Sequence, residues 1–427
     1  MAGSFWIETL GCPKNQVDSD KLLGTMLADG MVPAAAADEA DLVVVNTCAF
    51  VEEARQESID TILGLDAGRA PGARLVVTGC MAERYGTELA EALPEVDEVA
   101  GFGVPVTLGP RRRTGAGASV PSLDLLELPR PPAVAPWAYV KIAEGCDRAC
   151  GFCAIPTFRG PQRSRTIDDI SAEVDSLGVR EVVLVAQDLA AFGRDQGVGE
   201  RAIVPLVGAV AERVERVRLL YLYPSDLTDE LVDAICATGV PYFDLSLQHV
   251  SRPLLRRMRR WGDGARFAER MAAIRRREPG AAFRSNFIVG YPGETEADHD
   301  ALLAFVEQAQ LDWCGFFAYS REEGTHAADL DGVVPDGLVG ERLAELRERQ
   351  DAITAARRDE LIGSRVEVLV DAPGQGRTYR EAPEIDGVVA VPESIPVGTV
   401  LDVDVVDALG PDLVAELPLG VTAGAEA

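Results

Sequence analysis

The chain has 427 residues, too many for one ordinary domain, and its length predicts about three. Hydrophobic residues make up 47% and charged residues 26%, a globular composition that excludes a disordered or fibrous chain. No stretch approaches the roughly 20 apolar residues that span a bilayer, and the start lacks the features of a secretory signal. We therefore expect a cytoplasmic protein with no membrane partner. The net charge of −28 disfavours binding to nucleic acid, because phosphate contacts need Lys and Arg.

Residues 3–115 alternate strand and helix signals, which predicts an N-terminal parallel α/β domain. The expected strands are Phe5–Leu10, Leu42–Asn46 and Leu75–Thr78, and the expected helices are Val17–Ala28, Val51–Leu65 and Ala82–Leu93. Proline and glycine are dense over residues 110–136. Such a composition is typical of an interdomain linker, which we place at residues 116–131.

Residues 132–363 carry six apolar strand signals, most of them separated by helices. The strands are Tyr139–Ile142, Glu181–Gln187, Val217–Leu222, Tyr242–Leu247, Phe283–Val289 and Trp313–Tyr319. The helices include Ile167–Leu177, Asp229–Ala237, Ala297–Gln308 and a long one at Leu338–Leu361. Six β/α units are fewer than the eight that close a full barrel, so we expect a partial (β/α)6 barrel that is open on one side.

Residues 364–427 change to short strands in which apolar and polar residues alternate. The expected strands are Arg365–Val370, Ile385–Val391, Thr399–Val406 and Leu413–Leu417. Alternation of this kind is typical of half-buried antiparallel strands. We therefore predict a small C-terminal β-barrel of OB-like type.

Three of the eight cysteines form a Cys-x3-Cys-x2-Cys run, Cys146, Cys150 and Cys153, directly after the first barrel strand. Three thiolates on one short loop can hold three irons of a 4Fe–4S cluster and leave the fourth iron without a protein ligand. Structural zinc would need a fourth Cys or His nearby, and the nearest histidine is His249. The spacing therefore favours an iron–sulfur cluster with one open site.

This run, with the aromatic Phe152 before its last cysteine, resembles the radical S-adenosylmethionine (SAM) enzymes. The resemblance implies that the open iron binds SAM and that an electron from the cluster cleaves it to a 5′-deoxyadenosyl radical. Besides Phe152, we expect SAM contacts at the carboxyl ends of barrel strands, where such barrels build their sites. These candidates are Gln187, Gln248, Gly290 and Glu294. Ordinary strand-to-helix turns are the alternative explanation for them, and His249 is either buried or faces the site.

Cys12, Cys48 and Cys80 each directly follow a predicted parallel strand. Loops at the carboxyl ends of parallel strands converge on one crevice, so the three thiols should meet there. The sequence thus indicates a second metal centre. Cys236 and Cys314 fall inside a predicted helix and a predicted strand, and we expect them to be small core residues.

The whole arrangement resembles the methylthiotransferases, in which the terminal barrel is called TRAM. The resemblance implies a transferase with two 4Fe–4S clusters, the auxiliary one held by Cys12, Cys48 and Cys80, whose open iron carries the sulfur. It also implies a reductant such as flavodoxin or ferredoxin, and a sulfur donor. One branch modifies an aspartate β-carbon in ribosomal small-subunit protein twelve, and the other modifies an adenosine of transfer RNA.

The amino-acid sequences of five segments are similar to those of the ribosomal-protein branch: residues 144–160, 184–193, 220–224, 242–249 and 319–325. Gly151, where serine is familiar, is a departure that leaves the ligands untouched. Residues 363–427 contain three basic and twelve acidic residues. An RNA-binding barrel needs a positive surface with stacking aromatics, whereas an acidic barrel can attract a basic ribosomal protein. Protein substrate is therefore favoured over transfer RNA.

Two further classes stay open from the sequence. In a binding protein, one or both clusters would merely brace the fold, and reduction with SAM would give no 5′-deoxyadenosine. In another radical enzyme that used the N-terminal cluster for electron relay, deoxyadenosine would form without a thiolated product.

Overall fold

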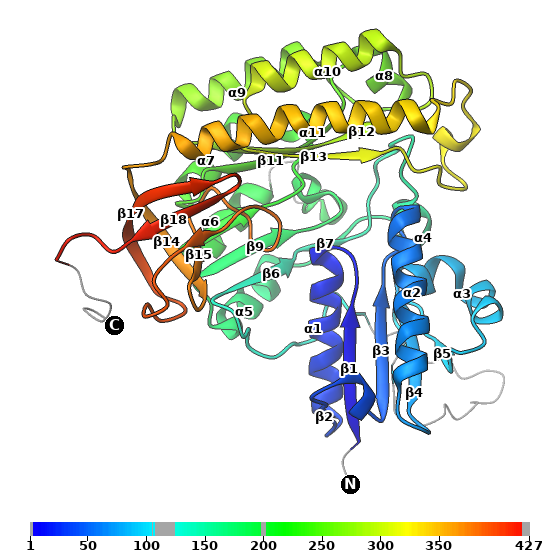
Figure 1. Cartoon of the computed structure of the whole chain (residues 1–427). Helices are drawn as coiled ribbons and strands as arrows, with labels where there is room; N and C mark the ends of the chain where they lie inside the picture. Colours follow the sequence, from blue (N-terminus) through cyan, green and yellow to red (C-terminus); the bar gives the residue numbers. More distant parts are fainter. Residues whose placement is uncertain (1–2, 105, 107–123, 198–201, 421–427) are drawn as a thin grey trace.

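The computed structural model describes residues 3–104, 106, 124–197 and 202–420. The strands form three bodies: a parallel sheet near the N-terminus, an incomplete barrel in the middle, and a small closed barrel near the C-terminus (Figure 1). This is the expected class of fold. None of the described helices is long and apolar enough to cross a membrane.

The N-terminal domain contains a five-stranded, fully parallel sheet in the order β2-β1-β3-β4-β5. The strands are β1 (Ser4–Thr9), β2 (Val32–Pro33), β3 (Leu42–Thr47), β4 (Arg74–Gly79) and β5 (Glu98–Val99), and the helices are α1 (Pro13–Ala28), α2 (Glu52–Gly68) and α3 (Cys80–Ala92). The three expected strands are confirmed. The sequence pattern missed β2 and β5 because two residues are too few to show alternation. It also began α1 four residues late, although Pro13 at the first helical position is a typical start signal.

The middle domain has the six expected parallel strands, arranged as two three-stranded sheets, β10-β9-β6 and β11-β12-β13. The isolated parallel bridge between Leu222 and Leu245 joins the two sheets. The strands are β6 (Trp137–Lys141), β9 (Glu181–Val185), β10 (Arg216–Leu219), β11 (Tyr242–Gln248), β12 (Ala282–Val289) and β13 (Trp313–Ala318). A partial barrel of six strands is confirmed.

Helices cover the outside of this barrel, and α9, α10 and α11 form one layer over β11, β12 and β13 (Figure 1). The helices are α4 (Ile155–Arg159), α5 (Ile167–Leu177), α6 (Ile203–Ala211), α7 (Asp229–Ala237), α8 (Arg252–Arg257), α9 (Gly264–Arg277), α10 (Glu296–Ala309) and α11 (Asp336–Asp359). A short antiparallel pair, β7 (Ala143–Glu144) and β8 (Arg163–Ser164), flanks the loop that carries Cys146, Cys150 and Cys153. The largest hydrophobic core lies between the barrel strands and these helices.

The C-terminal domain is a closed barrel of five strands in the order β14-β15-β16-β18-β17. The strands are β14 (Arg365–Ala372), β15 (Gln375–Arg377), β16 (Val389–Ala390), β17 (Val400–Leu409) and β18 (Asp412–Glu416). The expected strand Ile385–Val391 is wrong over most of its length, and β15 was missed. The reason is that Tyr379, Ala382 and Ile385 pack against residues of the large barrel rather than in the sheet of the small one.

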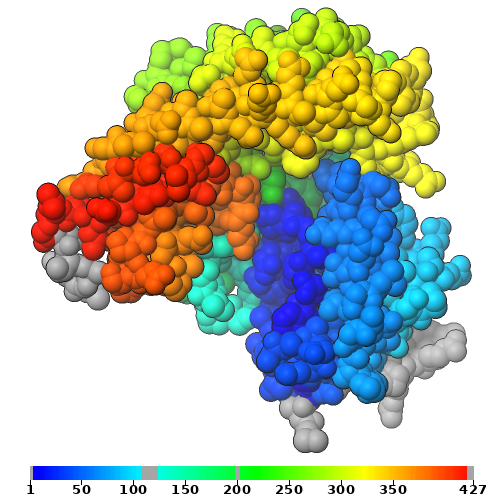
Figure 2. Space-filling view, in the orientation of Figure 1, coloured from blue at the N-terminus to red at the C-terminus, as the bar shows by residue number. Residues whose placement is uncertain are grey.

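The expected linker lies partly outside the described residues, which resume at Asp124. Its described part, 124–131, packs closely against the rest of the chain: Leu126 is 3% exposed, and its carbonyl accepts a hydrogen bond from Lys21. Arg130 is also buried and donates to the carbonyl of Tyr139. Figure 2 shows the N-terminal domain and the C-terminal barrel along one side of the helical layer formed by α10 and α11.

Candidate active site

The three N-terminal cysteines lie at the carboxyl edge of the parallel sheet. Cys12 is the residue that precedes α1, Cys48 follows β3, and Cys80 is the first residue of α3. A Cβ atom added to Gly11 would lie 2.8 Å from the Cβ atom of Cys48, so the loops that carry Cys12 and Cys48 touch. The glycine also has a φ of +97°, which a larger residue rarely adopts.

Asn15 connects the three loops. Its Nδ2 donates to the carbonyls of Leu10 (2.9 Å) and Thr47 (3.0 Å), which precede Cys12 and Cys48 closely in the chain. Its Oδ1 lies 3.6 Å from the Sγ of Cys80. One buried amide therefore holds the three thiols at the same edge of the sheet.

The thiols of this trio differ in their acidity. Burial raises the pKa of Cys48 to about 12, and burial also raises the pKa of Cys80. Burial acts in the same direction on Cys12, but Lys14 and Arg159 outweigh it and lower the pKa of that thiol. A bound metal removes the protons of such thiols, because the thiolate is the ligand. Two buried thiols and a partly buried one beside Lys14 and Arg159 fit a metal cluster better than they fit free cysteines.

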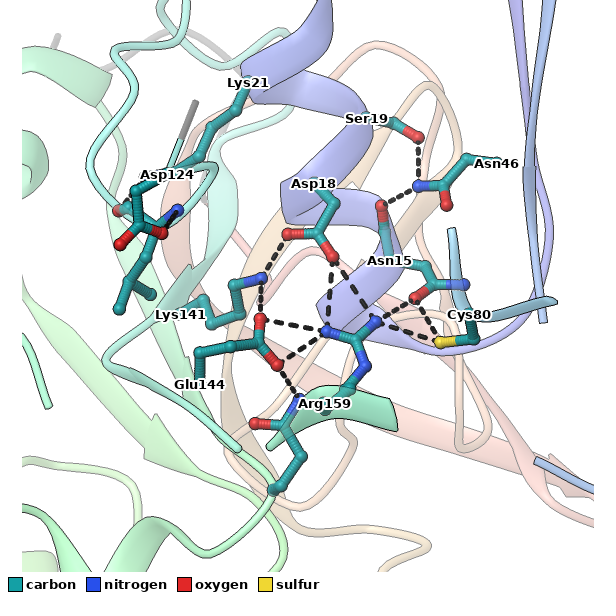
Figure 3. Close-up of polar contacts among 12 residues, drawn as sticks. Asn15, Asp18, Ser19, Lys21, Asn46, Cys80, Asp124, Lys141, Glu144 and Arg159 are labelled. Atoms are coloured by element: carbon teal, nitrogen blue, oxygen red, sulfur yellow. Dashed lines mark hydrogen bonds and ion pairs between the residues drawn. The ribbon is translucent and has the colours of Figure 1, made fainter. Parts of the chain in front are cut away.

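Arg159 lies in the centre of a buried polar network between the N-terminal domain and the barrel (Figure 3). Its Nη2 donates to the Sγ of Cys80 (3.1 Å) and to Oδ1 of Asn15 (2.8 Å), and its Nη1 donates to Glu144 (2.8 Å). Asp18 pairs with Arg159 at 3.4 Å and also with Lys141. Against the effect of burial, Arg159 and Lys141 hold the pKa of Glu144 well below its usual range, so this carboxylate stays ionised.

The second trio lies on the loop between β7 and β8. The backbone N–H of Arg148 donates to the Sγ of Cys146 (3.4 Å), and Nη1 of Arg260 donates to the Sγ of Cys150 (3.2 Å). The N–H of Gly151 donates to the carbonyl of Met258, the residue after α8 (2.8 Å), and this hydrogen bond fixes the loop there. Burial raises the pKa of Cys146 to about 11 and that of Cys153 to about 12.

Within the described ranges, no three His, Cys, Asp or Glu side chains converge closely enough to hold a single metal ion. Each thiolate of a 4Fe–4S cluster binds a different iron, so its sulfurs stand farther apart than the ligands of one ion. The described residues therefore form no site for a single ion such as zinc, and a cluster at either trio stays a prediction.

Family models match three parts of the chain: an uncharacterized protein family (UPF0004) over residues 4–101, the radical SAM superfamily over 140–306, and the TRAM domain over 362–417. Among curated relatives, the ribosomal protein uS12 methylthiotransferase RimO of Kineococcus radiotolerans is 42% identical and covers 97% of each chain. The RimO proteins of Moorella thermoacetica and Streptomyces coelicolor are 43% and 40% identical, over 90% and 96% of this chain and 91% and 96% of their own. The chain belongs to the RimO family of methylthiotransferases.

This RimO-family chain is thus a radical SAM methylthiotransferase, whose cofactors are 4Fe–4S clusters and SAM. A solved structure of the radical SAM methyltransferase TsrM from Kitasatospora setae, with tryptophan substrate and a SAM analog bound, is similar at a TM-score of 0.51. The two chains are 14% identical, and the match covers 83% of this chain and 90% of that one. At this identity the likeness concerns the fold alone, and it agrees with the partial barrel.

Three of the expected SAM contacts lie near the mouth of the barrel of this RimO-family enzyme. The Nε2 of Gln187 donates to Glu144 (2.8 Å), while its buried Oε1 has no partner among the described residues. Gln248 ends β11 with a φ of +69°, a strained conformation for a residue with a side chain. Phe152 packs against the large core. Their contact with SAM stays a prediction.

Gly290 and Glu294 stabilise the turn that follows β12. Glu294 accepts from the N–H groups of Gly290 (2.5 Å) and Tyr291 (3.2 Å), and it pairs with Arg342 of α11 at 3.0 Å. A Cβ atom at Gly290 would lie 2.5 Å from Val339, so the glycine lets α11 approach the strand. These contacts already explain why Gly290 and Glu294 stand at this turn. Binding of SAM by either residue stays a prediction.

His249 is fully buried, and its Nδ1 accepts a hydrogen bond from the N–H of Ser251 (3.0 Å). The charges near it belong to Asp298, His299 and Arg342 of α10 and α11. It therefore faces the helical layer. Of the two cysteines expected in the core, Cys236 and Cys314, both are partly buried and pack against the large core.

Sequence reasoning missed four residues that line the two trios: Asn15, Lys14, Arg159 and Arg260. Lys14 is two residues from Cys12 and lies 3.6 Å above the ring of Tyr221, which follows β10 and has a φ of +65°. Arg159 is six residues from Cys153, and charged residues so close to ligand cysteines are a usable signal. Arg260 is 107 residues or more from either trio, and its role required the tertiary structure.

Proposed function

We propose that this enzyme transfers a methylthio group to the β-carbon of an aspartate in ribosomal protein uS12. The observation that carries the proposal is similarity over nearly the full length to proteins named uS12 methylthiotransferases. All three parts of such an enzyme are present in the same order along this chain.

The charge of the C-terminal barrel supports a protein substrate. Residues 363–427 carry nine more acidic than basic residues, about twice the density of negative charge of the whole chain. Asp402 and Asp407 lie exposed on β17, where they can meet a basic partner. Ribosomal proteins are basic because they bind RNA, whereas a negative barrel repels the phosphates of transfer RNA.

Cys12, Cys48 and Cys80 would hold one 4Fe–4S cluster, and Cys146, Cys150 and Cys153 would hold the other. When bound, the clusters and SAM supply one-electron cleavage of the sulfonium, the methyl group and a site that carries sulfur. The chain orients these groups: Asn15 fixes the first trio, and the network around Arg159 fixes the distance between the two sites. Phe152, Gln187, Gln248, Gly290 and Glu294 are the residues at which we propose SAM contacts.

The reaction adds sulfur and consumes electrons, so the enzyme needs an external sulfur donor and a one-electron reductant such as flavodoxin or ferredoxin. We place the reaction in the cytoplasm, because ribosomal proteins are made and assembled there. The domain limits that suit this scheme are 3–115, 132–363 and 364–427, with a linker at 116–131. The family matches at 4–101, 140–306 and 362–417 fall in the same three regions. The start of the last match, at residue 362, supports the proposed boundary at residue 364.

Mass spectrometry of a reconstituted reaction tests the substrate. The anaerobically reconstituted enzyme, a reductant, sulfide, SAM and recombinant uS12 should yield uS12 with one added methylthio unit on an aspartate. A uS12 variant with asparagine at that position is the matched control and should stay unmodified. Unmodified uS12 together with a methylthiolated adenosine in transfer RNA would overturn the proposal, and deoxyadenosine without any thiolated product would also overturn it.

A further inference from the structure

Each cysteine trio has one thiol that accepts a hydrogen bond from a guanidinium group. Arg159 donates to the Sγ of Cys80 at 3.1 Å, and Arg260 donates to the Sγ of Cys150 at 3.2 Å. Neither arginine is near its cysteine in sequence: 79 residues separate the first pair and 110 the second. Two independent tertiary contacts therefore place the same chemical group at both sites.

Arg159 reaches across the domain boundary. It belongs to the barrel domain, at the end of α4, whereas Cys80 begins α3 of the N-terminal domain. Its side chain is 3% exposed. Asn15 and Asp18 accept from the same Nη2 as Cys80, and Glu144 accepts from Nη1, so these contacts restrict the position of the guanidinium.

Arg159 also links the two sites along the chain. Only Ala154 and the first four residues of α4 separate it from Cys153, a member of the other trio. Its charge acts on Cys12 as well as on Cys80. A displacement of the loop that carries Cys153 would therefore also displace Arg159, through the short helix α4.

Arg260 is held differently. Its Nη2 donates to the carbonyl of Ser246, and its guanidinium lies 4.3 Å from the centre of the Tyr223 ring. Within the described part of the chain it forms no ion pair with a carboxylate. Its positive charge therefore acts on Cys150 without a neighbouring anion to cancel it.

A hydrogen bond to a ligand sulfur and a nearby positive charge both stabilise the more negative, reduced state of an iron–sulfur cluster, which raises its reduction potential. We propose that Arg159 and Arg260 are positioning residues that set the potentials of the two clusters separately. Arg159 acts on the cluster at Cys12, Cys48 and Cys80, and Arg260 acts on the cluster at the other trio. The inference rests on the ligand assignment proposed above and is independent of the identity of the substrate.

The experiment measures the reduction potential of each cluster by electron paramagnetic resonance in the reconstituted holoenzyme. Arg159→Gln removes the charge and keeps an N–H donor, whereas Arg159→Lys keeps the charge but removes the guanidinium that reaches the sulfur. Arg260→Lys is the counterpart of the second variant at the other site. Alanine variants of each cysteine trio assign the two signals to their clusters. Arg163→Lys is the matched control, because Arg163 lies four residues from Arg159 but is 51% exposed and pairs with Asp124.

Each Arg159 variant should lower the potential of the first cluster and leave that of the second unchanged, and Arg260→Lys should do the reverse. Arg163→Lys should move neither. Iron content and thermal unfolding show which variants fold and contain both clusters. At the first site, either Arg159→Lys or Arg159→Gln with both clusters bound suffices for the measurement. Unchanged potentials in loaded variants, or equal shifts of both clusters, would overturn the inference. Full iron content in a trio variant would instead overturn the assignment of those cysteines as cluster ligands. Modification of uS12 is tested separately, by the mass spectrometry described above.

Discussion

Burial and nearby cations act in opposite directions on the pKa values of cysteine thiols in the two trios. Burial raises the pKa of Cys48 to about 12, yet Lys14 and Arg159 lower the pKa of nearby Cys12. Such a mixed environment is costly for free thiols and suits thiolates that share a metal cluster. Burial raises the pKa of Cys236 and of Cys314, and both thiols pack against the large core as small apolar residues.

We expect the variant Cys12→Ala/Cys48→Ala/Cys80→Ala to lose about half of the iron and sulfide of the reconstituted enzyme, because one of two four-iron clusters would be lost. Iron and sulfide analysis after anaerobic reconstitution measures this loss. The double variant Cys236→Ala/Cys314→Ala is the control and should keep its full content. Equal iron in both variants would contradict the assignment.

His249 predicts a pH dependence of stability. Burial lowers its pKa to about 4, whereas the unfolded histidine binds a proton near pH 6.5. As the pH falls below about 6.5 the unfolded state binds a proton that the folded state refuses, so stability decreases until about pH 4. The variant His249→Asn keeps an acceptor for the N–H of Ser251 and removes the titration.

Thermal unfolding of both proteins measures the effect. Between about pH 7.5 and pH 5.5 the parent protein should lose about 1 kcal/mol more stability than His249→Asn. Equal losses in the two proteins would show that His249 is not the group responsible.

The segment between β15 and β16 of the small barrel closes the amino end of the large barrel. Tyr139 donates to the carbonyl of Pro383 (2.9 Å), and Trp313 donates to that of Arg380 (2.6 Å). Glu181, at the start of β9, is fully buried between Arg218 (2.8 Å) and Arg377 (3.2 Å). This segment therefore packs into the end of the large barrel, whereas the strands of the small barrel enclose a separate hydrophobic core.

Replacing Glu181 by glutamine should destabilise the protein by about 3 kcal/mol, because it leaves the buried guanidinium of Arg218 without its ion-pair partner and Arg377 with Asp371 alone. Against the effect of burial, Arg377 and Arg218 lower the pKa of Glu181, so the native residue is charged. Glu215→Gln is the control: its pair with Arg180 is about half exposed and should contribute less than about 1 kcal/mol. Similar unfolding temperatures for the two variants would contradict this account.

Across the whole molecule, ion pairs and hydrogen bonds hold the N-terminal domain against the barrel. Besides Arg159, the contact includes Glu322, which follows β13 and is 3% exposed. It pairs with Arg55 (2.5 Å) and Arg84 (2.7 Å) of the N-terminal domain. Arg159 and Glu322 thus join the same two domains at different points.

Glu322→Gln should uncouple the two sites. Displacement of reacting groups by about 1 Å can cost roughly 100-fold in rate, so we expect the ratio of methylthiolated uS12 to 5′-deoxyadenosine to fall about tenfold or more. Chromatography of the nucleoside together with mass spectrometry of uS12 measures this ratio. Glu52→Gln is the control, because Glu52 pairs with the same Arg55 but is 71% exposed. An unchanged ratio in Glu322→Gln would contradict the coupling.

Much of this protein could be predicted from local patterns. Apolar runs located most of the longer strands of the three domains, because burial on both faces of a sheet gives a continuous apolar run and burial on one face gives an alternating one. The run of Cys146, Cys150 and Cys153 is equally local, since one loop supplies all three thiols. Cys12, Cys48 and Cys80 were grouped by a general rule, namely that the carboxyl ends of parallel strands meet.

The remaining features depend on contacts between residues far apart in the chain. Arg159 meets Cys80, Arg260 meets Cys150, and the segment that was expected as a strand at Ile385–Val391 instead closes the large barrel. Hydrophobic periodicity reports which face of an element is buried, but it carries no information about which partner buries it. Pairings between buried charges and thiols arise only when the domains pack, and for that reason they became visible in the tertiary structure alone.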